Sequence, residues 1–161
     1  MSWGDGTRSV RAGEAAPVPG APLRPSPVFA APFHLGDSPP RAGGADAYGR
    51  TEHPTLRDFE AAVGELDGGR CLSFATGMAA VSAAVLPFVG AGDRVVLPSD
   101  GYYTTRLLAA DELARFGVRV EYVPTLEIEA AAARGDLEGA RLVLLETPSN
   151  PQLDVCDIAA V

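Results

Sequence analysis

Three polar segments hold the residue types of this sequence that are best suited to ligand binding and proton transfer. They are Ala75-Thr76-Gly77-Met78, Ser99-Asp100-Gly101-Tyr102-Tyr103 and Glu146-Thr147-Pro148-Ser149-Asn150-Pro151. In the first segment, Thr76, Gly77 and Met78 would open a helix, where unpaired backbone amides and the helix dipole favour an anion such as phosphate. The alternative is an ordinary helix start, with Thr76 as the N-cap and Gly77 in the turn.

Tyr102 and Asn150 could contact a flat aromatic ligand. A tyrosine at this place can stack on a ring while its phenol takes part in proton transfer, although a half-buried surface aromatic is the alternative. The amide of Asn150 could hydrogen-bond a ring oxygen or a carboxylate, or the residue could serve only the turn in its Pro-Ser-Asn-Pro corner. Earlier in the chain, Arg50 near Tyr48 suits a phosphate held by a fork of donors, whereas a solvent-exposed loop arginine is the simpler alternative.

The hydrophobic pattern after residue 53 alternates between helices and short apolar strands. Pro54 suits a first helical turn, and apolar residues then recur at helical spacing up to Leu66. Further helices are expected at 78–88, 104–116 and 126–134, the start of another at 157–161, and strands at 71–75, 94–97, 118–123 and 141–146. Such alternation, with near-continuous apolar strands, is typical of an α/β fold with a mostly parallel sheet flanked by helices. Ligands bind at the carboxyl ends of such strands, so we expect the three polar segments to form one site.

Residues 1–53 differ in composition, and we expect an extended N-terminal arm without regular helix. Eight of the 14 prolines lie before residue 41, and proline lacks an amide donor and fixes φ. The apolar Val28, Phe29 and Phe33 indicate that part of this arm docks against another surface. Residues 54–161 are expected to be the first part of a larger domain, incomplete at its C-terminus, because the sequence stops one turn into an expected helix.

Composition excludes several classes of function. All 13 basic residues are arginine and 21 side chains are acidic, which gives a net charge of −8. Without lysine the chain cannot itself perform lysine chemistry, and its acidity argues against nucleic-acid binding.

Cys71 and Cys156 lie far apart and only two histidines are present, so we expect free thiols and no metal site. We find no secretion signal and no apolar segment long enough for a membrane span, which favours a cytoplasmic location without membrane contact.

Five segments, in order along the chain, resemble motifs of the Cys/Met-metabolism family of pyridoxal-phosphate enzymes. The first two are Thr7-Arg8-Ser9-Val10-Arg11-Ala12-Gly13, similar to T-x-x-[IV]-x-A-G, and Tyr48-Gly49-Arg50 with His53-Pro54-Thr55, similar to Y-x-R-x-x-N-P-T. The three polar segments resemble S-S-G-M-A-A, D-x-Y-G-G-T and E-[ST]-P-[ST]-N-P. The sequence departs from these motifs at His53, which stands for Asn, and at Tyr103-Thr104, which replaces Gly-Gly and would reshape the substrate entrance.

The resemblance implies a fold-type I, transferase-like fold with pyridoxal 5'-phosphate as cofactor. Thr76 and the backbone amides of Gly77 and Met78 would bind the cofactor phosphate. Tyr102 would stack on the pyridine ring and act in proton transfer, and Asn150 would lie near the ring hydroxyl. Tyr48 and Arg50 would reach the phosphate bound in a neighbouring subunit, which makes the arm a contact within a homodimer or homotetramer.

The activity implied by the resemblance is trans-sulfuration, in which the C–S bond of cystathionine or a related sulfur amino acid is eliminated or replaced. The family's cofactor-binding lysine, and the aspartate that faces the ring nitrogen, follow the E-[ST]-P-[ST]-N-P motif and are not found in this sequence. We therefore expect this chain alone to be inactive. The alternative is a non-catalytic α/β module that binds a phosphorylated ligand or a subunit partner.

Overall fold

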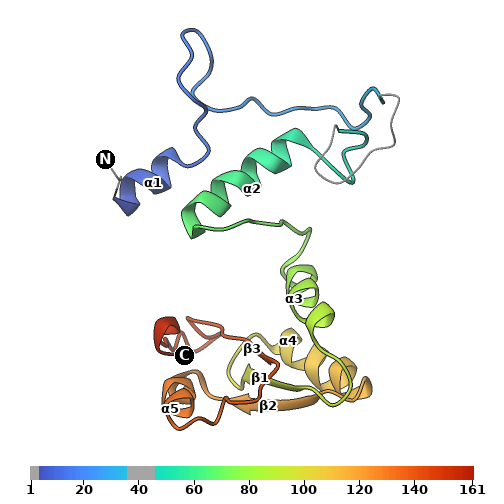
Figure 1. Cartoon of the computed structure of the whole chain (residues 1–161), viewed down its shortest axis with the longest axis vertical. Coiled ribbons are helices and arrows are strands. Elements are labelled where there is room, and N and C mark those ends of the chain that lie inside the picture. The colour runs from blue at the N-terminus through green and yellow to red at the C-terminus, as the bar shows by residue number, and fades with distance from the viewer. Residues whose placement is uncertain (1–3, 36–45) are drawn as a thin grey trace. The chain divides into compact units, whose positions relative to one another are not determined.

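The computed structural model describes residues 4–35 and 46–161. The chain divides into two compact units, Met1–Ser73 and Phe74–Val161, which are treated separately below. Figure 1 shows the elements of both units in chain order. None of the described helices combines the length and the hydrophobicity needed to span a bilayer.

The described residues of the first unit form two helices, one of which contradicts the expected arm without regular helix. α1 spans Asp5–Arg11 and lies entirely before the first proline, so the factor that excludes helix from the rest of the arm does not act on it. α2 spans Pro54–Asp67, with proline in its first turn and a left-handed Gly68 (φ 69°) after its last residue. The Arg8 guanidinium donates to the carbonyl oxygens of Glu65 and Leu66 at 2.8 and 3.1 Å. These hydrogen bonds place α2 in the same unit as the arm.

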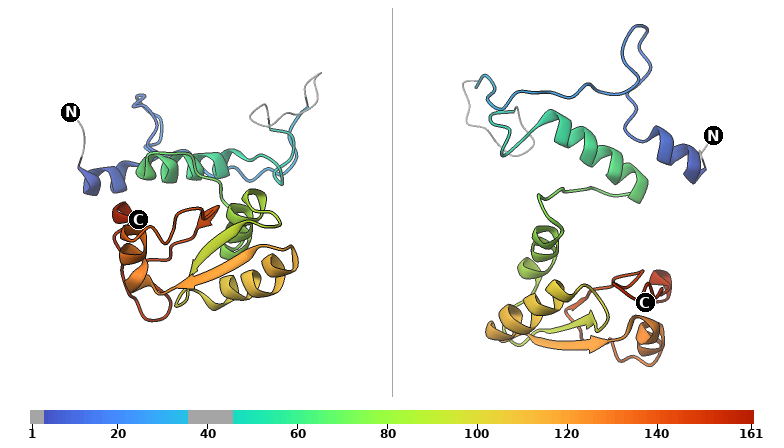
Figure 2. Two further views of the ribbon diagram at one scale, coloured as in Figure 1. Left: turned by 60° about the horizontal axis from the view of Figure 1, so that its bottom comes forward. Right: turned by 180° about the vertical axis from the view of Figure 1, so that it is seen from behind.

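The second unit is built on a parallel sheet with the strand order β2-β1-β3. β1 spans Arg94–Pro98, β2 spans Arg119–Val123 and β3 spans Leu142–Val143. In this register Val95 lies opposite Val120 on one side and Leu142 on the other, and β1 and β2 run side by side (Figure 2). Crossover helices connect the parallel strands, as this topology requires.

The helices of the second unit are short and several continue with a change of helical type. α3 spans Gly77–Val85 and continues as a 3-10 turn at Leu86–Phe88. α4 spans Tyr103–Leu107 and widens into a π-helix at Leu108–Leu113. α5 spans Ile128–Ala133 after a 3-10 turn at Thr125–Glu127, and a last 3-10 turn spans Ile158–Ala160.

Side chains alternate along β1 between two hydrophobic clusters, one on each face of the sheet. On one face Val95 and Leu97 pack with residues from α3, from the π-helix and from the position just before β2, namely Val85, Ala109, Leu113 and Val118. On the other face Val96 packs with Ile128 of α5 and with Cys156. A strand covered on both faces must be apolar at every position, which explains its continuous Val-Val-Leu run. The expected α/β fold, a parallel sheet flanked by helices, is confirmed.

Two expected strands differ from the structure. Residues 71–75 form no strand, and only Leu142 and Val143 of the expected segment 141–146 pair with β1. An apolar run becomes a strand only where a neighbouring strand supplies hydrogen-bond partners, which neither hydropathy nor β-propensity reports. Leu144 still donates its N–H to the carbonyl of Val96 at 2.9 Å, so the chain follows β1 a little beyond the formal strand.

Truncating Leu97 tests how far the second unit depends on its central strand. Leu97 is 2% exposed, and Leu97→Ala removes buried apolar surface and leaves a cavity on one face of the sheet. We expect the free energy of unfolding to fall by about 2–5 kcal/mol, measured by urea denaturation. Leu126→Ala is the matched control because Leu126 is 68% exposed, and it should change stability by less than about 0.5 kcal/mol. Equal losses in the two variants would contradict this account of the core.

Candidate functional site

Five of the residues singled out in the sequence line one cavity in the second unit. Its volume is about 560 Å³, and the five are Thr76, Gly77, Met78, Tyr102 and Asn150. The wall between them is largely apolar, with Val81, Leu144 and Leu145 among its members. A cavity of this size with a few converging polar groups is typical of a small-molecule site. The three polar segments therefore meet, as the parallel topology predicts.

The start of α3 contributes a capped turn and two backbone amides. The Thr76 side chain accepts a hydrogen bond from the backbone N–H of Ala79 at 3.1 Å, so Thr76 is the N-cap. Gly77 and Met78 follow it in the first turn, where N–H groups have no partner within the helix. A Cβ built on Gly77 would meet no atom within 4 Å, so the space beside this backbone is open. The N-cap alternative is thus correct, and it leaves the first-turn amides available to an anion.

Tyr102 stands immediately before α4 and is held through its backbone. Its N–H donates to Oε2 of Glu146 at 2.7 Å, and its carbonyl accepts from the N–H of Thr105 at 3.1 Å. Its ring, 39% exposed, meets the Tyr103 ring edge-on, with centroids 5.4 Å apart and planes at 68°. Sequence reasoning assigned Glu146 to a motif but gave it no role, because no local pattern reports a contact across 44 residues.

Asn150 lies in a compact turn that follows β3. Ser149, 1% exposed, accepts through its hydroxyl from the N–H of Asp154 at 3.1 Å, and its own N–H donates to the Asp154 carbonyl at 2.8 Å. The peptide bonds that precede Pro148 and Pro151 are cis. The turn is therefore fixed by Ser149, while the exposed Asn150 faces the cavity.

Hydrogen bonds between polar groups connect the residues that follow the three strands. One carboxylate oxygen of Asp100, after β1, accepts hydrogen bonds from the N–H and the hydroxyl of Thr125, after β2, at 3.0 and 2.9 Å. Burial opposes the charged form of Asp100, but the hydrogen bonds from Thr125 and from Ser149 outweigh it, so the pKa of this carboxyl lies below its ordinary value. These hydrogen bonds therefore favour the charged form of Asp100.

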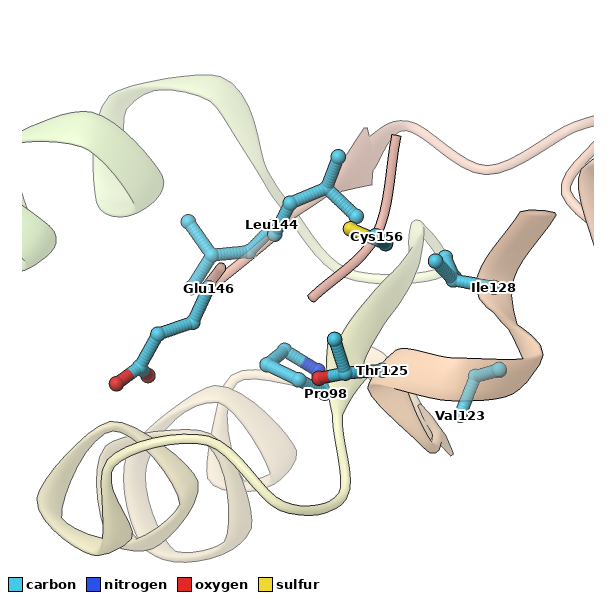
Figure 3. A pocket seen from close by; sticks show the side chains of 8 residues that line it. Pro98, Val123, Thr125, Ile128, Leu144, Glu146 and Cys156 are labelled. Carbon is cyan, nitrogen blue, oxygen red and sulfur yellow. The ribbon is translucent and has the colours of Figure 1, made fainter. Parts of the chain in front are cut away.

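Behind the strand ends lies a second and much smaller cavity, which Figure 3 shows. Its volume is about 10 Å³ and its lining includes Pro98, Ile128 and Cys156. This space holds no more than about one water molecule. Of these two cavities at the strand ends, the larger therefore has room for a ligand.

Tyr48 and Arg50 belong to the first unit, whereas all the residues that line this cavity belong to the second. The Arg50 guanidinium lies 4.3 Å above the centre of the Tyr48 ring, a cation–π contact. Their loop is tied to the arm, because the N–H of Gly49 donates to the Ala31 carbonyl at 2.7 Å. Their approach to a phosphate in a neighbouring subunit stays a prediction. Within residues 4–35 and 46–161, no three His, Cys, Asp or Glu side chains are grouped so that they could hold a metal ion.

Comparisons with known proteins agree on one family. Residues 22–161 match the model of the Cys/Met metabolism PLP-dependent enzymes. A Streptomyces coelicolor protein provisionally named cystathionine gamma-lyase is 47% identical over 160 residues, which are 96% of this chain and 39% of that protein. The cystathionine gamma-synthase of Mycobacterium tuberculosis is 31% identical over 98% of this chain and 40% of its own length.

Solved structures give the same result for the fold. The structure of metB from Corynebacterium glutamicum superposes with a TM-score of 0.77 at 28% identity, over 99% of this chain and 41% of that one. The cystathionine gamma lyase CalE6 from Micromonospora echinospora superposes with a TM-score of 0.74 at 32% identity, over 98% and 41%. The chain thus spans about two fifths of the length of the relatives it matches.

The lowered pKa of Asp100 predicts an acid-sensitive contribution to stability. A carboxyl whose folded pKa lies below its unfolded value of about 3.9 stabilises the fold above that value, and this stabilisation is lost as the pH falls through the folded pKa. Asp100→Asn should lower the free energy of unfolding by about 1–3 kcal/mol at pH 7. The loss should shrink toward pH 3 in urea titrations. Asp111→Asn, on an exposed helical position, is the control, and an equal loss there would contradict the role of the hydrogen bonds to Asp100.

Proposed function

Since the chain belongs to the Cys/Met metabolism family of pyridoxal-phosphate-dependent enzymes, we propose that its second unit forms the part of the cofactor site that binds the phosphate and faces the pyridine ring. The observation that carries this proposal is the meeting of the α3 start, Tyr102 and Asn150 around one cavity of about 560 Å³. The open space beside Gly77 and the first-turn amides of α3 suit a phosphate. The apolar wall and the tyrosine ring suit the flat ring.

The residues of the cavity divide into three roles under this proposal. Thr76 fixes the start of α3, and the N–H groups of Gly77 and Met78 donate to phosphate oxygens. Tyr102 covers one face of the ring, and its phenol oxygen holds or moves a proton beside the substrate. The Asn150 amide donates to the ring hydroxyl. When bound, pyridoxal 5'-phosphate supplies an electron sink for charge that develops on the substrate.

We further propose that the complete protein acts on the C–S bond of a sulfur amino acid, by elimination or replacement at the γ or β carbon. The names of the relatives support this reaction class, since they include cystathionine gamma-lyase, cystathionine gamma-synthase and L-methionine gamma-lyase. The 161 residues hold no lysine, so the group that anchors the cofactor covalently has to come from outside them, and this chain alone is inactive. A cytoplasmic location is part of the same proposal.

The arm is proposed to complete the site of a second copy in a homodimer or homotetramer. Among the described residues that line the cavity, none carries a positive charge. Arg50, in cation–π contact with Tyr48, is suited to supply that charge because a guanidinium binds phosphate through paired donors. Phe29 is 98% exposed in the single chain, which suits an arm whose apolar side chains are covered by a partner.

Binding of pyridoxine 5'-phosphate to this chain tests the proposal directly. The probe carries the ring, its hydroxyl and the phosphate but no aldehyde, so binding is noncovalent and needs no lysine. We expect Tyr102→Ala to weaken binding about three- to tenfold by titration calorimetry, because an aromatic stacking contact is lost. Tyr122→Ala is the matched control, since Tyr122 is similarly exposed, at 42%, and does not line this cavity.

The outcomes also separate an enzyme from a non-catalytic module, which the absence of lysine favours as the second candidate. In a protein where these residues continue into the family's lysine, bound cofactor should give visible absorption that borohydride abolishes. A module would bind the probe without that absorption. No binding of pyridoxine 5'-phosphate, or equal losses in Tyr102→Ala and Tyr122→Ala, would overturn the assignment of the cavity.

A further inference from the structure

Glu146 is a carboxylate in a cavity proposed to receive an anion, and its position needs a physical reason. It lines the cavity together with the start of α3 and Tyr102. Figure 3 shows its side chain with the carboxylate directed away from Cys156 and Ile128. A negative charge here disfavours a phosphate or carboxylate ligand by Coulomb repulsion. The residue must therefore contribute something that offsets this cost.

The contribution lies in the contact between Glu146 and the segment after β1. Oε2 of Glu146 accepts the backbone N–H of Tyr102 at 2.7 Å, a short, charge-assisted hydrogen bond. The adjacent Gly101 is buried, and a Cβ at that position would lie 2.9 Å from Oε2 and 2.6 Å from Cγ of Pro98. There is thus no room for a side chain between the carboxylate and the end of β1, and glycine at this position lets the two approach closely.

Fixing this N–H fixes the direction in which the tyrosine side chain leaves the backbone. The Tyr102 carbonyl already accepts from the N–H of Thr105 in the first turn of α4. With its N–H and its carbonyl both held, the orientation of the Cα–Cβ bond is determined. The ring is then limited by the edge of the Tyr103 ring, 5.4 Å away between centroids. Three contacts thus restrict one aromatic ring, two at its backbone and one at the ring, and Glu146 supplies the backbone contact that comes from a distant part of the sequence.

We propose that Glu146 is a positioning residue that holds the Tyr102 ring over the cavity, an inference that rests on the proposed cofactor site. It acts through Tyr102 and makes no productive contact with the ligand. The carboxylate is retained in the cavity because its acceptor oxygen orders the aromatic ring. A ring ordered before binding loses less entropy when the ligand arrives, and binding is tighter for that reason.

A double-mutant cycle on the full chain tests this inference with pyridoxine 5'-phosphate as the probe. Glu146→Ala should weaken binding about three- to tenfold, and Glu146→Gln, whose amide oxygen can still accept the N–H, should weaken it less. In the Tyr102→Ala background both substitutions should have no effect or strengthen binding slightly, since no ring remains to position and a charge is removed. Glu127→Gln, outside this cavity, is the control for loss of one negative charge and should leave affinity unchanged.

The amide resonance of Tyr102 gives a readout that needs no ligand. In two-dimensional NMR spectra its proton should move upfield in Glu146→Gln and further in Glu146→Ala, while the fold remains intact by the other amide resonances. If the Glu146 substitutions weaken binding equally with and without the Tyr102 ring, or if the Tyr102 amide does not shift, the positioning role is wrong although the cofactor site stands. If the unsubstituted chain does not bind the probe, the proposed function fails and this inference fails with it.

Discussion

Burial of β1 on both faces is the constraint on which the second unit depends. Val95 and Val96 are fully buried on opposite faces, so the buried part of the strand, from Val95 to Leu97, has no room for a polar side chain. The polar side chains that could serve a site therefore follow the strand, beginning with Ser99 and Asp100. Because β2 and β3 run parallel to β1, their carboxyl ends arrive at the same edge. The burial of β1 on both faces thus determines that a polar site forms at this edge of the sheet.

At this edge of the sheet, two carboxylates accept hydrogen bonds from other segments and so fix the loops that follow the strands. Asp100 binds Thr125 across the sheet, and Glu146 binds the N–H of Tyr102. Each carboxylate loses hydration when it is enclosed, and this loss is tolerable only where N–H or O–H donors replace water. The two acidic groups at the edge consequently act on the backbone. They set the relative position of loops that hydrophobic packing alone leaves undetermined.

Sequence reasoning located the elements that depend on local signals. The helix at Pro54, the helix after Thr76 and the strands at 94–97 and 118–123 all formed where their patterns indicated. α1 differs from the expectation because the prolines begin only at residue 17, so they do not exclude a helix at residues 5–11. Residues 71–75 have the composition of a strand, but no strand in the described part of the chain pairs with them. β3 has only two residues for a related reason, because its pairing with β1 ends at Val143.

The residues that line the cavity could be predicted because they follow the ends of strands. The contact of Glu146 with Tyr102 depends on the distance between two loops after folding, which no sequence period encodes.

Charge explains why an arm would take part in such a site. A phosphate monoester carries about −1.5 to −2 charges near neutral pH, whereas the start of a helix offers only about half a positive charge. The cavity's described lining adds a carboxylate and no cation, so α3 alone leaves most of the phosphate charge unbalanced. Since the chain has no lysine, the side chains in it that are always positively charged are its 13 arginines, and a guanidinium is the best source of the missing charge. Cζ of Arg50 lies 4.3 Å from the centre of the Tyr48 ring, and a guanidinium in such a cation–π contact keeps planar N–H donors that match the geometry of a phosphate. Arg50 is accordingly suited to bind a phosphate, and under the proposed function it supplies from the arm the charge that the sheet edge lacks.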